Sequence, residues 1–140
     1  MDGENNDPMQ LAKDKEWLDQ FIQDKLKKQI TKVEQEVDNI RNKKIRGATK
    51  KQKDMLKALN DKLKLMRATR ENCEELAMTM EFLEGGALKG LKSALKKYYD
   101  DHEDEGLRNN VDKQCTALID MADSKRKAED LLKTAGIVPG

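Results

Sequence analysis

The chain has 140 residues, enough for one domain, and its net charge of +1 argues against a protein that works mainly by neutralising phosphate groups. Charged residues make up 39% of the chain and aromatic residues only 4%, which argues against a thick globular core. The only two prolines, Pro8 and Pro139, stand near the ends, so no proline forbids long helices between them.

The first helix is predicted from Pro8 to about Arg46, because an aspartate stands before Pro8 as a candidate N-cap and proline suits the first helical position. From Leu26 onward its apolar residues alternate at spacings of four and three, the heptad pattern of helices that pack lengthwise. Trp17 and Phe21 widen the apolar face, which predicts a third element packed against its beginning. The apolar face comprises Leu11, Leu18, Ile22, Leu26, Ile30, Val33, Val37 and Ile40.

A second helix is predicted from about Lys50 to Glu84. Gly47 is expected to end the first helix, and Thr49 with Gln52 fits a capping box at the start of the second. A loop this short makes the two helices antiparallel neighbours, each about 50–60 Å long. The second helix has its own heptad stripe, with Arg70 in one slot: Leu56, Leu59, Leu63, Met66, Cys73, Ala77 and Met80.

Two further helices are predicted after a break at Gly85 and Gly86. The shorter runs from Ala87 to about Tyr99, and its apolar face comprises Leu88, Leu91, Leu95 and Tyr98. The last runs from about Leu107 to Thr134 and ends at Gly136. Its stripe comprises Val111, Cys115, Leu118, Ala122 and then Leu131 or Leu132, with Lys125 in one slot.

An alternative joins these two helices into one bent rod, which would make a three-helix bundle. The acidic run between them contains good helix formers, and only Gly106 argues for a real break.

The predicted fold is therefore all-α: a long antiparallel helical hairpin with one short and one long further helix, forming a three- to four-helix elongated bundle with coiled-coil-like packing. We expect a disordered tail over residues 1–7, a single bundle domain over 8–135 and a second tail over 136–140.

Seven basic residues crowd around the predicted hairpin turn, and we call them the basic tip: Arg41, Lys43, Lys44, Arg46, Lys50, Lys51 and Lys53. Cations suit the end of the first helix, but they oppose the dipole at the start of the second. One interpretation is a solvated turn. The other is a docking patch for a protein partner, an anionic membrane or nucleic acid.

The predicted short helix is cationic and amphipathic, because four lysines flank its apolar face: Lys89, Lys92, Lys96 and Lys97. Such a helix can lie on a membrane or in a partner's groove. The favoured interpretation is that its apolar face instead covers the open end of the hairpin near Trp17 and Phe21.

The acidic run matches a calcium-binding loop only in outline, through Asp101, Glu103, Glu105, Gly106 and Asp112. Two ligand positions carry Glu in place of Asp or Asn, and the final bidentate Glu is replaced by the shorter Asp. We therefore predict a solvated turn and no metal site.

Candidate catalytic residues are scarce. The single histidine, His102, lies in the acidic run, and Ser93 and Ser124 lie outside any nucleophile elbow. Cys73 and Cys115 occupy apolar-periodic positions, where buried thiols are usually inert. We predict that the protein is not an enzyme and that it uses no cofactor, metal or small-molecule substrate.

The sequence thus favours a protein–protein interaction module, an adaptor, scaffold or regulatory bundle, that binds through a helix face and the basic tip. Electrostatic binding of an anionic membrane or nucleic acid is the alternative, and coiled-coil homo-oligomerisation, as in a homodimer, is the third. Two cysteines and no N-glycosylation acceptor or apolar N-terminal run favour an intracellular, cytoplasmic location.

Overall fold

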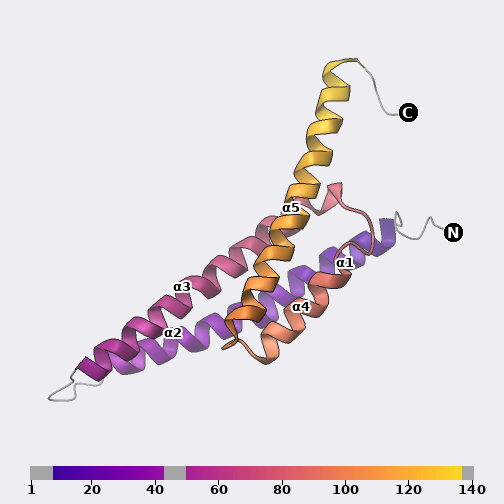
Figure 1. Ribbon diagram of the computed structural model, residues 1–140. Coiled ribbons are helices and arrows are strands. Elements are labelled where there is room, and N and C mark those ends of the chain that lie inside the picture. Colours follow the sequence, from indigo (N-terminus) through magenta and orange to yellow (C-terminus); the bar gives the residue numbers. More distant parts are fainter. Residues whose placement is uncertain (1–7, 43–49, 137–140) are drawn as a thin grey trace.

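The computed structural model describes residues 8–42 and 50–136, and over these ranges it contains helices and no strand (Figure 1). The predicted all-α fold is confirmed. In chain order the elements are α1 (Pro8–Phe21), the π-helix η2 (Ile22–Leu26), α2 (Lys27–Asn42), α3 (Lys50–Thr79), the 3-10 turn η3 (Met80–Phe82), α4 (Lys89–Asp100) and α5 (Glu105–Thr134).

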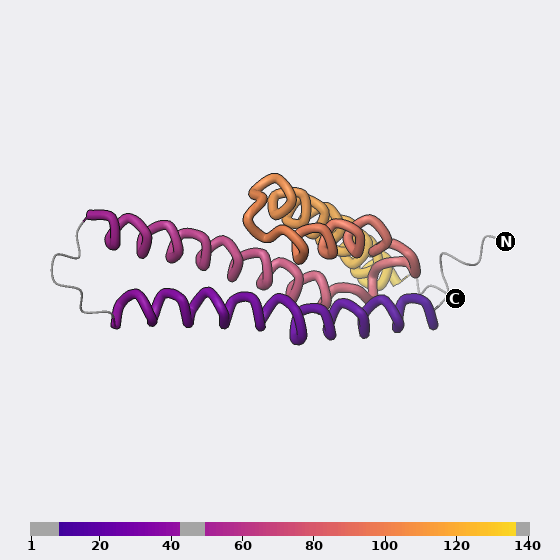
Figure 2. The backbone as a smooth tube through the Cα atoms, turned by 90° about the horizontal axis from the view of Figure 1, so that it is seen from below, coloured from indigo at the N-terminus to yellow at the C-terminus, as the bar shows by residue number. Residues whose placement is uncertain are grey.

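The predicted hairpin is present: α1, η2 and α2 form one continuous helical path that runs antiparallel to α3 (Figure 2). Near its far end the Gln52 side chain donates a hydrogen bond of 2.8 Å to the backbone carbonyl of Ile40. Gln52 therefore ties α3 to α2. Gly47, predicted to end the first helix, and Thr49, predicted to cap the second, lie outside the described residues.

The π-helix η2 is a feature that the sequence analysis did not predict. Leu18, Ile22, Leu26 and Ile30 recur at spacings of four, which would carry the stripe around an ordinary 3.6-residue helix. The amide of Lys27 donates to the carbonyl of Ile22, five residues back, and the wider turn compensates for this drift. As a result, all four apolar side chains remain buried.

The packing of α3 changes along its length. Its first half pairs with α2, where Leu56 and Leu59 are half-buried and Leu63 and Met66 form a small core with Ile30 and Val33. Over its second half α3 also packs against α5. This second contact buries Thr69 and Leu76, which the single heptad stripe had left out, and the buried set is Leu63, Met66, Thr69, Cys73, Leu76 and Ala77.

Helices α4 and α5 are separate, so the single bent rod is wrong. Asp104 ends the turn between them, and its carboxylate accepts hydrogen bonds from the amides of Gly106 (2.8 Å) and Leu107 (3.2 Å). This N-cap starts a new helix. Gly106 is therefore not the break, because it lies inside the first turn of α5.

The third element predicted near Trp17 and Phe21 is α4. Its predicted apolar face is buried as a whole (Leu88, Leu91, Leu95 and Tyr98) in the main core between α1, α3 and α5. The Phe21 ring stacks on Trp17 with centroids 5.0 Å apart and meets the edge of Tyr99 at 6.0 Å. The interpretation of this amphipathic helix as a cover for the hairpin is thus the one that the fold supports.

The predicted stripe of the last helix is right only in part of its first half, where Leu118 is half-buried and the unpredicted Ile119 is buried instead. Val111, Cys115, Ile119 and Ala122 are buried, but no residue of α5 after Ala122 is. Leu131 is 70% exposed, Leu132 is 40% exposed and Lys125 is also at the surface. The reason is geometric, because α5 crosses the hairpin at an angle and its C-terminal half projects beyond it (Figure 1).

Candidate functional site

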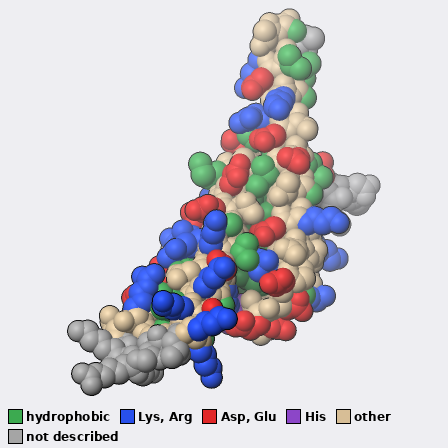
Figure 3. Space-filling model, turned by 60° about the vertical axis from the view of Figure 1, so that its left-hand side comes forward, with side chains coloured by type: hydrophobic (Ala, Val, Ile, Leu, Met, Phe, Trp, Pro, Cys, Tyr) green, Lys and Arg blue, Asp and Glu red, His purple; other side chains and the backbone are tan. Residues whose placement is uncertain are grey.

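Four residues of the basic tip are described, and all four are exposed: Arg41 in the last turn of α2, and Lys50, Lys51 and Lys53 at the start of α3. None of the four forms an ion pair with another described residue. Figure 3 shows lysine and arginine side chains gathered toward this end of the hairpin. Lys43, Lys44 and Arg46 lie outside the described residues.

The four lysines of α4 have different environments. Lys92 forms an ion pair of 2.7 Å with Asp14 and lies 5.4 Å from the centroid of the Trp17 ring, so it joins α4 to α1. Lys96 is exposed but lies 6.0 Å from the same ring. Lys89 and Lys97 are exposed. The structure does not bring these lysines together with the basic tip, because α4 packs beside the opposite half of the hairpin (Figure 1).

Asp14 is the most deeply buried charged group among the described residues, with 1% of its surface exposed. Its carboxylate accepts hydrogen bonds from Lys92 (2.7 Å), from the Gln10 side chain (2.8 Å) and from the amide of Gly86 (3.0 Å). Burial alone would raise the pKa of Asp14, but the hydrogen bonds from Lys92, Gly86 and Gln10 outweigh it and lower the pKa. The group is a structural anchor that leaves no open position for a ligand.

Gly86 explains how the chain reaches this anchor. Its φ of +92° lies in the left-handed region, which glycine adopts without a steric penalty. The second helix was predicted to run to Glu84 and break at these glycines, but α3 already ends at Thr79 and η3 follows it. The turn at Gly85 and Gly86 instead aims a backbone amide at a buried carboxylate. No sequence pattern linked Asp14 to this turn, which lies 72 positions further along the chain.

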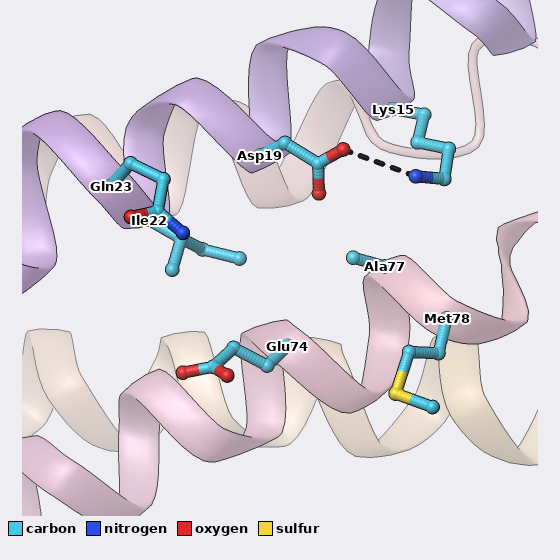
Figure 4. Close-up of a pocket in the computed structure, with 7 residues that line it drawn as sticks. All are labelled: Lys15, Asp19, Ile22, Gln23, Glu74, Ala77 and Met78. Atoms are coloured by element: carbon cyan, nitrogen blue, oxygen red, sulfur yellow. Dashed lines mark hydrogen bonds and ion pairs between the residues drawn. The ribbon is translucent and has the colours of Figure 1, made fainter.

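A shallow groove runs between α1 and α3. One cavity of about 250 Å³ is lined by Lys15, Asp19, Ile22, Gln23, Glu74, Ala77 and Met78 (Figure 4). A neighbouring cavity of about 370 Å³ shares Lys15, Ala77 and Met78. Lys15 and Asp19 pair with each other at 3.1 Å, and Met78 is 82% exposed. The groove can accept a partner's apolar side chain, but its lining residues present no aligned acid, base and nucleophile.

The two cysteines face each other in the core. Cys73 of α3 and Cys115 of α5 are fully buried free thiols with their Sγ atoms 3.7 Å apart. The hydrogen bond with Cys115 and burial raise the pKa of Cys73 above its ordinary value, so the thiol form is favoured. Burial also raises the pKa of Tyr98 to about 12. These groups belong to the core and do not form an open site.

The acidic turn does not have the geometry of a calcium loop. Glu105, Gly106 and Asp112 are helical residues of α5, whereas a calcium loop needs the chain to wrap around the ion. Glu103 instead binds Lys62 of α3, which lowers the pKa of Glu103, and His102 lies 3.5 Å from the same carboxylate. Among the described residues, no group of three or more His, Cys, Asp or Glu side chains is arranged to hold a metal ion.

A surface that the sequence analysis missed runs along α5, from Ala117 beside the buried half of the helix to its C-cap residue Ala135. Small and apolar residues recur along it at spacings of four, three, four, three and four, and all of them are exposed; we call them the exposed α5 seam: Ala117, Met121, Ser124, Ala128, Leu131 and Ala135. The signal was in the sequence as a second heptad stripe. It was hidden because the stripe through Val111 and Cys115 accounted for the same helix.

Comparison with known proteins gives no relative. No family model, curated protein or solved structure matches the chain. Within the described part of the chain, no helix combines the length and apolar character that a membrane-spanning segment requires.

Proposed function

We propose that the protein is a protein–protein interaction module, an adaptor, scaffold or regulatory bundle without chemistry of its own, and that it binds its partner along the exposed α5 seam. The observation that carries the proposal is the exposed face of α5, on which Met121, beside the last buried turn, is 58% exposed and Leu131, in the projecting segment, is 70% exposed at heptad spacing. A heptad seam of this kind is how one helix recognises another.

The rest of the molecule supports this proposal by holding α5 rigidly. The buried half of α5 packs against both α3 and α4, and Asp104 caps its first turn. The helix therefore leaves the bundle in a defined direction, with its seam presented to solvent. The two thiols and Asp14 are enclosed in structural contacts, so they do not suggest a reaction.

A crosslinking experiment tests the proposal. A photo-crosslinking amino acid in place of Ser124 should attach a discrete partner protein, and the added change Leu131→Glu should abolish the product. The same amino acid in place of the exposed Arg126 is the matched control, because Arg126 lies on the side of α5 opposite the seam, in line with the buried Ile119 and Ala122. Equal labelling from the two positions, or labelling that survives Leu131→Glu, would contradict the proposal.

A second candidate function is electrostatic binding of an anionic surface through the basic tip. It is favoured by the four exposed cations at the end of the hairpin, which lack an ion-pair partner among the described residues. Lys50, Lys51 and Lys53 stand at a helix N-terminus, where the helix dipole disfavours positive charge. Since these charges do not stabilise α3, a role outside the fold would explain them.

A further inference from the structure

We infer that the partner of the exposed α5 seam is a second copy of this chain, and that the two α5 helices pair in parallel and in register. The inference rests on the proposed function and names its partner. It starts from the isolation of the projecting helix. Past Asp123, α5 runs to Thr134 without one buried residue. A helix segment of this length is marginal in water without packing, so a neighbour that covers its apolar side would stabilise it.

The order of residue sizes suits pairing with an identical helix. In heptad terms Met121, Ala128 and Ala135 are a positions, while Ala117, Ser124 and Leu131 are d positions. A parallel pair in register places each of these residues against the same residue of the second copy. The two large residues then meet large ones, and the small residues between them let the helices approach closely.

The flanking charges select the parallel orientation. In the same heptad frame Asp120 is a g position and Lys125 is the e position that follows it. In a parallel pair, g of one helix faces the following e of the other, so each Asp120 faces Lys125 of the second copy. These two symmetric pairs bring opposite charges together on either side of the seam.

The antiparallel arrangement with full overlap of the seam is disfavoured by the same residues. In that arrangement e faces e and g faces g near the centre, which would place Lys125 against Lys125 and Lys127 against Lys127 of the second copy. Asp120, Lys125 and Lys127 form no ion pair with other described residues of their own chain. Their charges are therefore free to interact with the second copy, where they would favour the parallel over the antiparallel orientation.

The first test measures self-association of the full chain by analytical ultracentrifugation, up to roughly 500 µM because small interfaces bind weakly. We expect a concentration-dependent dimer. Asp120→Lys or Lys125→Asp alone should raise the dissociation constant by roughly 5- to 10-fold, since each single change creates two like-charge pairs. The double variant should restore it. Lys133→Asp, at an exposed position on the side of α5 opposite the seam, should leave it unchanged.

The second test determines the orientation. In a parallel pair the two residues 124 face each other, so Ser124→Cys should give a disulfide-linked dimer when oxidised glutathione is added. Arg126→Cys should not. A preferred crosslink between Ser124→Cys and Ala128→Cys chains would mean antiparallel pairing and would overturn the inference. So would a monomer at every concentration, or a double charge variant that fails to recover.

The two proposals fail separately. A monomeric chain whose position 124 still crosslinks to a different protein would overturn the inference and leave the proposed function standing. A monomeric chain with no crosslink specific to the seam would overturn both.

Discussion

Asp14 shows at the scale of one residue how this thin bundle holds its parts together. Its carboxylate accepts three hydrogen bonds: from the charged Lys92 of α4, from the backbone amide of Gly86 and from the side-chain amide of Gln10 in its own helix. Hydrogen bonds to a buried charge are among the stronger ones in proteins, and removal of one partner leaves the others unsatisfied.

We therefore expect Asp14→Asn to lower the free energy of unfolding by about 2 kcal/mol, a figure kept low because Lys92 is partly exposed and can reach water. Urea unfolding followed by circular dichroism measures this. Asp19→Asn is the matched control, since the exposed Lys15–Asp19 pair should contribute less than about 0.5 kcal/mol. Equal effects of the two changes would contradict the role given to Asp14.

The same residue predicts a pH dependence. The pKa of Asp14 is lowered in the folded protein from its ordinary value of 3.8, so its contribution to stability is complete above that value and is lost as the pH falls through the lower folded value. The stability difference between the wild type and Asp14→Asn should hence shrink below about pH 4. Unfolding curves at stepwise lower pH measure it; a difference that grows toward acid would refute the assignment.

The paired thiols should be chemically silent in the native protein. Cys73 and Cys115 are fully buried, and the pKa of Cys73 is raised, so a thiol reagent must wait for the core to open. We expect a colorimetric thiol reagent to react at least about 100-fold more slowly than with the urea-unfolded chain. Rapid labelling of both thiols in native buffer would show that the contact between α3 and α5 opens easily.

At the scale of elements, α5 has two halves with different tasks. Its first half completes the core between α3 and α4, and its second half projects with an exposed seam (Figure 1). We therefore expect a chain that ends after Asp123 to have a free energy of unfolding within about 0.5 kcal/mol of that of the full chain, because no buried residue is removed. Urea unfolding measures it.

The truncated chain should also lose the seam-dependent crosslinking and self-association. The comparison with the full chain uses circular dichroism for the fold and ultracentrifugation for assembly. A large loss of stability on truncation would show that the projecting half packs against its own bundle, which would remove the basis of both proposals.

At the scale of the whole molecule, the hairpin separates two kinds of surface. One end carries the exposed cations of α2 and α3, and the C-terminal half of α5 projects away from that end (Figures 1 and 3). Because these surfaces are far apart, the two candidate functions can be removed one at a time.

The change Lys50→Glu, Lys51→Glu and Lys53→Glu should test the basic tip in this way. Sedimentation with vesicles of anionic lipid should show binding of the wild type that weakens steeply with salt and disappears in the triple variant, while the fold and the assembly through α5 persist. The neutral change of the three lysines to Gln should give an intermediate result. Vesicle binding that survives the reversal would exclude the tip as an anionic-surface site.

Much of the architecture could be predicted from local patterns. The heptad stripes of α2 and α3 and the apolar face of α4 depend only on residues that are near each other in the chain. Periodicity and backbone preference act over one or two turns, so these local patterns were enough to predict that the segments are helices and where their main apolar stripes lie.

Three features depended on tertiary structure. The π-turn η2 keeps one stripe aligned with a partner, Asp14 meets a turn 72 positions away, and Leu131 is exposed although its spacing resembles that of a core residue. An apolar stripe predicts which face of a helix is apolar, but it does not predict whether another helix packs along the whole length of that face. The crossing of α5 over the hairpin decided that, because burial requires a neighbour, and the neighbour ends before the helix does.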